Sequence, residues 1–361
     1  MNCVTVARAA RTHDPQDMKR LVLVLAAFLL STGWTIRNLG TLPGGGLSNA
    51  QGVNITGEVA GQAMNSAGVM RAVYWNKVGA ITEIPTPVIP GTFSVAYDIN
   101  NLGWVVGRMA TSAANPRAFK WRFGAALTDL GGGPTSIAMG INEANHVAGQ
   151  WIAAGTPTRW YAVVWPGGTP GSPFWLGGFG GYVDFASDVA HNAPVATGTA
   201  ADAAGHRHAF LYLDGSGPIR DLGTLGGDNS FGRSVTVGTW PDPTEETIYV
   251  VGESETMPGS FDTDAFLYHR GVMTNIGGLP GCTRNYAYAI NGNKDVVGYS
   301  WCGGYSRAWL YRAGVMYDLY SLLPAGTGWT ELQFAHDINE SGFIVGSGFY
   351  LGQSRAFLMK P

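Results

Sequence analysis

The stretch Ser94-Val95-Ala96-Tyr97-Asp98-Ile99-Asn100-Asn101-Leu102-Gly103-Trp104-Val105-Val106-Gly107 contains the pattern that decides the fold. Small and large residues alternate along 94–100, and a period of two is typical of a β-strand. Gly103 supplies the positive φ that a tight hairpin needs, and the β-branched run after it ends at Gly107. The stretch therefore predicts two strands joined by a hairpin.

The glycine that ends the second strand recurs along the chain, and a triplet with a central alanine follows each copy. Periods of this length are typical of repeat architectures. We interpret the triplets as third strands and the recurring Gly, Ala, Trp and Asn as structural. The glycines are Gly61, Gly107, Gly149, Gly198, Gly252, Gly298 and Gly346, and the alanines are Ala72, Ala118, Ala162, Ala209, Ala265, Ala308 and Ala356.

A fourth strand follows each of the first six triplets, at 81–84, 127–131, 174–177, 219–223, 273–277 and 316–319. The last unit ends after its third strand, and a seventh copy of the fourth strand stands at 35–40. A ring whose first strand completes its last unit has no open edge at the seam. We therefore predict an all-β, seven-bladed β-propeller of four-stranded antiparallel blades, with small residues on the inner strands letting the blades approach near the axis.

At these residues the chain resembles the bacterial "extracellular repeat, HAF family" proteins, named for a triplet that occurs here as His208-Ala209-Phe210. The similarity extends to 221–227, 338–342 and 344–346, and in weakened form it covers about 36–360. It implies an exported, repeat-built protein and carries over no catalytic residues. Units four and five depart from the pattern, because Ala190 and Thr236 replace the hairpin asparagine.

The start of the chain carries the pattern of a secretory signal peptide. Lys19 and Arg20 precede the apolar run 21–30, and small residues follow it. A run of ten residues is too short to span a bilayer, which takes about 20. We predict a leader at 1–33 with translation starting at Met18, a single propeller domain at 34–361, and an exported chain, extracellular or periplasmic, whose mature form has no membrane span.

Composition and charge exclude several classes of function. The chain is 45% hydrophobic and only 13% charged, which excludes a disordered protein and a coiled coil. Its net charge is −3 without a run of like charges, so we expect no nucleic-acid partner. We expect a monomer.

Cys282 and Cys302 remain in the predicted mature chain. Because strands alternate in direction, the loops before the first strand and after the second strand of every unit emerge on one face. Both cysteines lie in such loops of unit six, so we predict a disulfide, with two free thiols as the alternative.

A ligand site is expected where the units differ, on this same face, which we call the Cys282 face. Exposed aromatic rings beside Asp, Arg and Asn suit sugars, which stack on rings and bond through their hydroxyls. The alternative is that these rings pack the loops onto the strands. The candidates are Trp151, Arg159, Trp160, Phe179, Tyr182, Asp184, His206, Arg207, Asp228, Asp262, Arg284, Tyr286, Trp301, Tyr305, Trp329 and Glu331.

No metal or cofactor is predicted. His206 and His208 can share a strand face but lack an adjacent third ligand, and Asp262 with Asp264 lacks the remaining oxygen ligands of a calcium loop. The sequence has no Gly-x-Ser-x-Gly elbow and no His-Glu-x-x-His. Carboxylate pairs across the ring mouth stay open, drawn from Asp184, Asp228, Asp262 and Glu331.

The leading hypothesis is an exported, non-enzymatic binding propeller for an extracellular carbohydrate or another surface polymer. A propeller-fold glycosidase or polysaccharide lyase is one alternative, and a scaffold that binds a surface protein is another. Buried carboxylates in a deep central pocket favour the enzyme, and flat exposed aromatics favour binding. The sugar platform depends on Trp151, Trp160, Trp301 and Trp329 being accessible.

Overall fold

The computed structural model describes residues 33–110, 115–131, 133–152, 159–171, 173–191, 193–213, 218–238, 244 and 246–361. Within these ranges the chain is built from β-strands, and helix is confined to short 3-10 turns at Pro166–Gly168 and Leu319–Leu322. The predicted all-β class is confirmed. The predicted leader and its start at Met18 lie outside the described residues.

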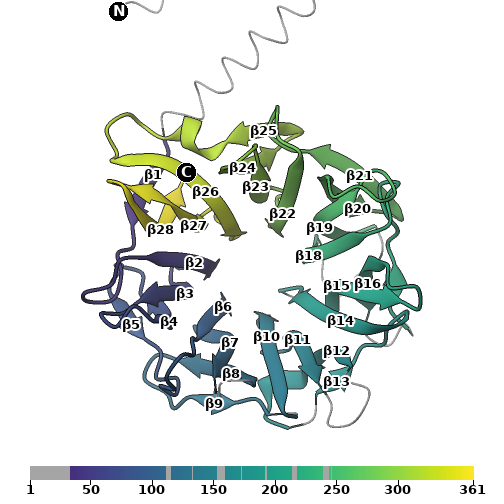
Figure 1. The fold of residues 1–361 in the computed structure, drawn as a ribbon, viewed down its shortest axis with the longest axis horizontal. Helices are drawn as coiled ribbons and strands as arrows, with labels where there is room; N and C mark the ends of the chain where they lie inside the picture. The colour runs from purple at the N-terminus through teal and green to yellow at the C-terminus, as the bar shows by residue number, and fades with distance from the viewer. Residues whose placement is uncertain are drawn as a thin grey trace, which may run out of the picture.

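The strands pair in antiparallel groups of four that follow chain order. The first groups are β2 (Ser48–Val53), β3 (Val59–Met64), β4 (Met70–Trp75) and β5 (Ile81–Glu83); then β6 (Val95–Ile99), β7 (Trp104–Ala110), β8 (Pro116–Arg122) and β9 (Thr128–Asp129); then β10 (Thr135–Ile141), β11 (Val147–Ile152), β12 (Trp160–Trp165) and β13 (Phe174–Trp175). Figure 1 shows the groups arranged around a central opening, which gives a propeller-like architecture.

The next groups are β14 (Gly180–Val189), β15 (Val195–Asp202), β16 (Arg207–Leu213) and β17 (Arg220–Asp221); then β18 (Ser230–Val237), β19 (Ile248–Glu255), β20 (Thr263–His269) and β21 (Val272–Gly277); then β22 (Arg284–Ile290), β23 (Val296–Trp301), β24 (Ser306–Arg312) and β25 (Val315–Asp318). Single parallel pairs, Trp160 with Val183 and Thr263 with Arg284, join four groups into two eight-stranded sheets. Neighbouring groups therefore touch along their strands as well as through side chains.

The N-terminal strand completes the last group. β1 (Thr35–Asn38) pairs antiparallel with β28 (Gln353–Lys360), which is followed inward by β27 (Ile344–Tyr350) and β26 (Trp329–Ile338). The register sets Thr35 opposite Lys360 and Asn38 opposite Phe357. The predicted pairing of the first strand with the last strand is confirmed.

The recurring glycines allow a close backbone approach within each group. A Cβ at Gly107 would lie 2.0 Å from the Val95 carbonyl oxygen, and one at Gly252 would lie 1.8 Å from that of Phe231. The register shifts at this point because the inner strand bulges toward the second strand. Any side chain at these positions would push the two strands apart, which explains the repeat.

Inner-strand glycines let neighbouring groups approach, as expected from the sequence. A Cβ at Gly52 would lie 2.9 Å from the Cα of Asp98, and one at Gly140 would lie 3.1 Å from the Cα of Asp188. The apolar core lies between the groups. In one cluster Val59 and Trp75 of one group pack with Leu358 of another, and Trp75 is fully buried.

Asparagines at the hairpins link most neighbouring groups to one another. The Asn339 amide donates to the Asn54 carbonyl oxygen over 2.7 Å, and the Asn100 amide donates to that of Asn142 over 2.9 Å. The side-chain oxygen of each asparagine also accepts hydrogen bonds from backbone N–H groups of its own hairpin. This Asn chain runs through Asn291, Asn339, Asn54, Asn100 and Asn142 to the carbonyl of Ala190. It stops there because Ala190 and Thr236 have no side-chain amide to donate. These residues belong to units four and five, whose sequences depart from the repeat pattern.

Candidate functional site

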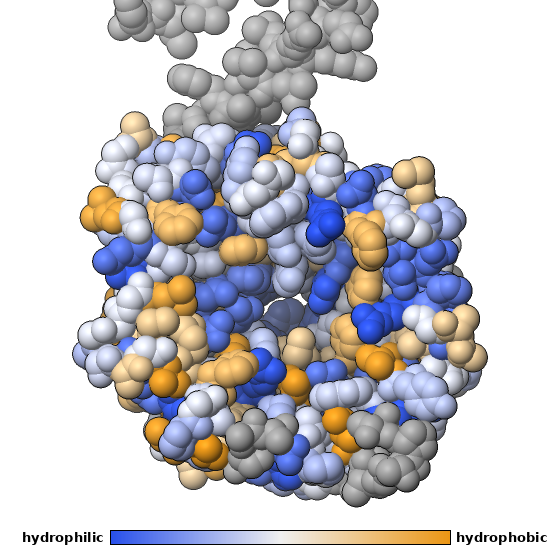
Figure 2. Space-filling model, viewed as in Figure 1, coloured by the Kyte–Doolittle hydropathy of each residue, from blue (hydrophilic) through white to orange (hydrophobic). Residues whose placement is uncertain are grey.

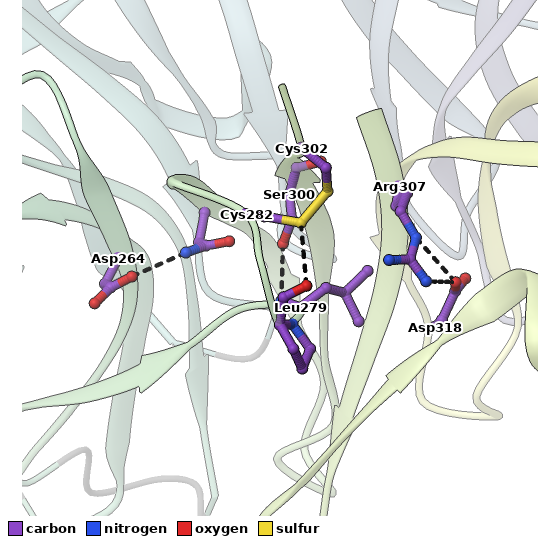
Figure 3. The surroundings of a disulfide bond; sticks show 9 residues. Asp264, Leu279, Cys282, Ser300, Cys302, Arg307 and Asp318 are labelled. Carbon is purple, nitrogen blue, oxygen red and sulfur yellow. Dashed lines mark hydrogen bonds and ion pairs between the residues drawn. A yellow bond between two sulfur atoms is a disulfide. The ribbon is translucent and has the colours of Figure 1, made fainter. Parts of the chain in front are cut away.

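A disulfide joins Cys282 and Cys302, with their Cα atoms 4.2 Å apart (Figure 3). Cys282 precedes β22 and Cys302 follows β23, so the bond fastens the two loops at one end of this hairpin. The Leu279 amide donates to Ser300 Oγ over 3.1 Å beneath it. The predicted pairing is confirmed, and a disulfide is consistent with export.

A cavity of about 510 Å³ opens among β16, β18, β19, β20 and β22, two residues along the chain from Cys282 at Arg284. We call it the face cavity. Its volume lies within the usual range of ligand pockets. It is lined by Gly205, Arg207, Asn229, Phe231, Arg233, Glu253, Glu255, Phe261, Thr263, Arg284 and Tyr286.

Two exposed arginines at this cavity have no acidic partner. Within the described ranges, neither Arg207 nor Arg284 forms an ion pair. The backbone N–H of Arg207 donates to Asn229 Oδ1 over 2.9 Å, and Arg284 lies opposite Trp301 in the β22–β23 ladder. The backbone positions of Arg207 and Arg284 are thus fixed at the cavity, and their guanidinium groups are available to bind the oxygens of an anion.

The carboxylates of the cavity already have partners. Glu253 is 2% exposed and accepts two hydrogen bonds from Arg233 Nε, at 3.1 and 3.0 Å. Burial lowers the pKa of Arg233, but the adjacent Glu253 carboxylate raises it above its ordinary value. Glu255 accepts hydrogen bonds from the backbone N–H groups of Asp228 and Asn229, both at 3.1 Å. The lining carries three arginines and two glutamates, and the Glu255 carboxylate is held by neutral donors, so the net charge of the cavity wall is positive by one.

Aromatic rings form part of the cavity wall. Phe261 is 81% exposed, and Tyr286 stacks on Tyr299 with ring centroids 4.6 Å apart. Burial raises the pKa of Tyr286, which keeps its phenol protonated. The wall is concave and combines rings with cations, unlike the flat aromatic surface expected from the sequence.

Three of the predicted residues line this cavity, namely Arg207, Arg284 and Tyr286. Trp301 ends β23 opposite Arg284 and is 40% exposed, and Tyr305 lies in the loop of Cys302 and is 49% exposed. Asp228 anchors the neighbouring loop by accepting the N–H of Gly259 over 2.8 Å. The Cys282 face predicted from the sequence therefore contains a cavity lined by three of the candidates. Three further lining residues, Arg233, Glu253 and Phe261, were not among the candidates.

The four-tryptophan platform does not form. Trp329 is 4% exposed and packs edge-on against Phe357 in the core, because it begins the long strand β26 instead of belonging to a loop. Trp151 packs on Tyr161 with centroids 5.8 Å apart, and Trp160 is half-buried in β12. Of the four, Trp301 alone is exposed, and the other three lie in strands and pack there, so they offer no shared surface to a sugar.

The other candidates are dispersed. Asp184 is fully buried and pairs with Arg159 over 3.1 Å, and burial raises its pKa despite that partner. Phe179 packs against a core cluster, while Tyr182 is 62% exposed. Asp262 and Glu331 are exposed, and neither lines the face cavity. Asp184, Asp228, Asp262 and Glu331 therefore form no carboxylate pair at this cavity.

The histidine pair has separate partners. His206 Nδ1 lies 3.2 Å from Asp202, and His208 Nδ1 lies 2.7 Å from Asp221. In the described part of the chain, no three His, Cys, Asp or Glu side chains are placed to hold a metal ion.

A second cavity, of about 110 Å³, lies at the axis, and we call it the central cavity. Figure 2 shows the molecule hollowed there, with hydrophilic residues along the wall. Asp98, Asp188 and Asp337 line it, and each carboxylate accepts backbone N–H groups from its own group and from another. For example, Asp337 accepts from Val53 over 2.7 Å and so ties the last inner strand to the first.

These carboxylates have raised pKa values. Burial, with the nearby charge of Asp188, raises the pKa of Asp98 to about 6, and burial with the charge of Asp98 raises that of Asp337 to about 7. Burial lowers the pKa of His191, but its hydrogen bond to Glu143 and the charges of Asp98 and Asp188 outweigh this and raise it to about 9. Burial lowers the pKa of His336 to about 4.

We expect stability to fall as pH rises from 6.5 to 9. In this window the folded chain holds protons on Asp337 and His191 that the unfolded chain releases, so raising the pH favours unfolding. His336 opposes the trend only below pH 6.5, since it is neutral in both states above it. Water at the cavity wall screens these charges, so we expect a loss of about 2 kcal/mol, measured by urea unfolding across the window.

His191→Gln is expected to flatten this slope, because it removes the imidazole that Glu143, Asp98 and Asp188 hold protonated. His206→Gln, at a histidine outside the central cavity, is the matched control. Unfolding free energies that rise or stay level between pH 6.5 and 9 in the natural chain would contradict the assignment.

No helix in the described residues is long and apolar enough to cross a membrane. No family model matches the chain, and no curated protein matches its sequence. The β-propeller domain of the Trilobed protease from Pyrococcus furiosus is similar in structure, with a TM-score of 0.54 at 10% identity over 86% of this chain and 95% of that one.

Two further structures extend the likeness. An oligogalacturonate lyase in complex with manganese gives a TM-score of 0.54 at 11% identity over 91% of this chain and 94% of that one. A prolyl endopeptidase gives 0.55 at 9% identity over 97% of this chain and 56% of that one. At such identities the likeness concerns the fold alone, and it identifies this chain as an all-β protein of propeller-like architecture.

Proposed function

We propose that this chain binds an anionic saccharide, a sugar bearing carboxylate or sulfate groups, in the face cavity. The observation that carries the proposal is the pair of exposed arginines, Arg207 and Arg284, which lack an acidic partner in the described chain and stand beside the rings of Phe261 and Tyr286. Guanidinium groups bind carboxylates and sulfates through paired hydrogen bonds, and aromatic rings pack against the C–H faces of sugars.

We also propose a finer architecture, which the strand pairing supports. The four-stranded groups correspond to seven blades, with β1 as the outer strand of the last blade. The confirmed disulfide supports an exported protein, extracellular or periplasmic. Membership of the HAF repeat family, the monomeric state and the domain boundary at 33/34 stay predictions.

Cleavage of the bound saccharide is the second candidate function, by a glycosidase or polysaccharide lyase reaction. It is favoured by Tyr286, whose protonated phenol lies beside Arg284 and can donate a proton to a leaving oxygen. Structures that share the fold include an oligogalacturonate lyase and a prolyl endopeptidase, so the fold is compatible with catalysis. The buried carboxylates of the central cavity also match the feature expected of an enzyme, although each already accepts backbone N–H groups. In the lyase form of this candidate, Arg284 holds the uronate carboxylate and a solvent base removes the proton on the carbon beside it. The carbon–carbon double bond then forms as the glycosidic C–O bond breaks, and Tyr286 protonates the leaving oxygen.

The experiment is a calorimetric titration of the purified chain with uronic-acid, sulfated and neutral oligosaccharides. We expect the anionic sugars to bind and the double variant R207Q/R284Q to lose at least about 100-fold in affinity, since each lost charged hydrogen bond costs about 1.5 to 3 kcal/mol. R122Q, at an exposed arginine far from the cavity, is the matched control. Equal binding of neutral sugars, or no effect of the double variant, would refute the proposal.

The same mixtures are then assayed for unsaturated uronate and for new reducing ends. Product formation that is lost in Y286F, with binding retained, would establish the second candidate. Binding without product would leave a binding protein, and the absence of both would point to a surface protein as the partner.

A further inference from the structure

We propose that Arg108 forms a second subsite for the same anionic saccharide, across the axis from the face cavity, so that the ligand is a polymer that reaches both. This inference rests on the proposed function of the face cavity. It concerns a cavity of about 130 Å³ around Phe93 and Arg108, which we call the Arg108 cavity.

The Arg108 cavity repeats the chemistry of the face cavity on a smaller scale. Phe93 is 47% exposed, and the Arg108 guanidinium carbon lies 4.5 Å from the centre of its ring. Within the described chain Arg108 forms no ion pair, and its Nε is buried without a hydrogen-bond partner. A cation without a counter-ion beside an exposed ring is the combination found at Arg284.

The position of Arg108 in the repeat shows that a neutralising partner is absent. Arg108 follows Gly107 on β7 as Glu253 follows Gly252 on β19. In the unit of β19, Arg233 on the inner strand neutralises Glu253. The corresponding inner residue beside Arg108 is Tyr97, which interacts with the guanidinium but carries no charge to offset it. The positive charge is therefore left for a ligand.

The two cavities open on one face. Phe93 precedes β6, as Cys282 precedes β22, and Arg108 and Glu253 lie toward the same end of the second strands. Figure 1 places β6 and β7 across the central opening from β18 and β22. A disaccharide therefore occupies one cavity at a time, whereas a longer polyanion crosses the opening and contacts both.

The test is a length series of uronic-acid oligosaccharides, from the disaccharide to the dodecasaccharide, titrated against the full chain. Once the oligomer is long enough to bridge the subsites, the second contact is intramolecular, and we expect an affinity gain of about 100-fold. R108Q should remove this gain and leave disaccharide affinity unchanged, while R284Q should weaken binding at every length. R108K keeps the charge and should restore part of the gain.

The second variant is F93S, which removes an exposed ring of the same cavity and should also reduce the affinity gain of long oligomers. With this variant the test does not depend on whether the fold tolerates a change at Arg108. Affinities of R108Q and F93S that match the natural chain at every length would overturn this inference and leave the proposed function standing. Absence of binding to every oligomer by the natural chain would overturn both.

Discussion

A chain that begins at Thr41, and so lacks β1, is expected to show no cooperative unfolding transition. The deletion removes Trp34 and Leu39, which are 3% and 4% exposed, and strips β28 of its outer partner. Loss of two buried side chains of this size costs on the order of 7 kcal/mol, which is comparable with the whole stability of a domain. The uncovered edge of β28 also favours aggregation.

The measurement is urea unfolding followed by tryptophan fluorescence and far-UV circular dichroism. The matched control begins at Gly33 and keeps β1, and we expect its transition to be that of the full chain. Addition of a synthetic peptide covering residues 33–42 should restore a transition to the shortened chain, since a strand can pair in trans. A shortened chain that unfolds at the same urea concentration as the control would show that β1 contributes little.

Glu253→Ala is expected to lower the free energy of unfolding by about 3 to 5 kcal/mol. The Glu253 carboxylate is 2% exposed and neutralises Arg233, whose side chain is 27% exposed between the two cavities. Removing one partner of a largely buried ion pair leaves the other charge uncompensated. Thermal and urea unfolding of the purified variant measure the loss.

The double variant R233M/E253L is the control for this prediction, because it removes both charges and keeps apolar volume. We expect it to recover most of the stability, since well-packed apolar residues often replace a buried ion pair at little cost. A double variant as unstable as Glu253→Ala would show that packing, and not the uncompensated charge, causes the loss.

The strands and their closure could be predicted because backbone geometry recurs in every unit. Gly107 and its counterparts must be glycine wherever an inner strand bulges, so the pattern is visible without structure. The disulfide was predictable for a related reason, since strand direction alone places Cys282 and Cys302 at one end of a hairpin.

The cavity was only partly predictable, because residues from separate units build it. Arg207 begins β16, Phe261 lies in a loop and Arg284 begins β22, and no spacing in the sequence relates them. Trp329 was misassigned for the opposite reason: an aromatic residue outside the recurring columns looked like loop surface, but it begins β26 inside the core.

The three carboxylates of the central cavity could have been found from the repeat pattern in the sequence. The same position of the repeat is an aspartate in three units, Asp98, Asp188 and Asp337. In two other units this position is a glycine, Gly52 and Gly140. The glycines leave room for the carboxylates of adjoining units, since a Cβ at Gly140 would lie 3.0 Å from an oxygen of Asp188. Alternation of a charge with a glycine in a repeat thus indicates a contact between units.

The pairing of Thr35 with Lys360 also sets the timing of folding during synthesis. Strand β1 can pair with β28 only once almost the whole described chain that separates them has been made. Contacts between such distant segments form slowly, because a long loop must close first. The seam between β1 and β28 is therefore expected to close after the strands between them have paired, as the last step of folding.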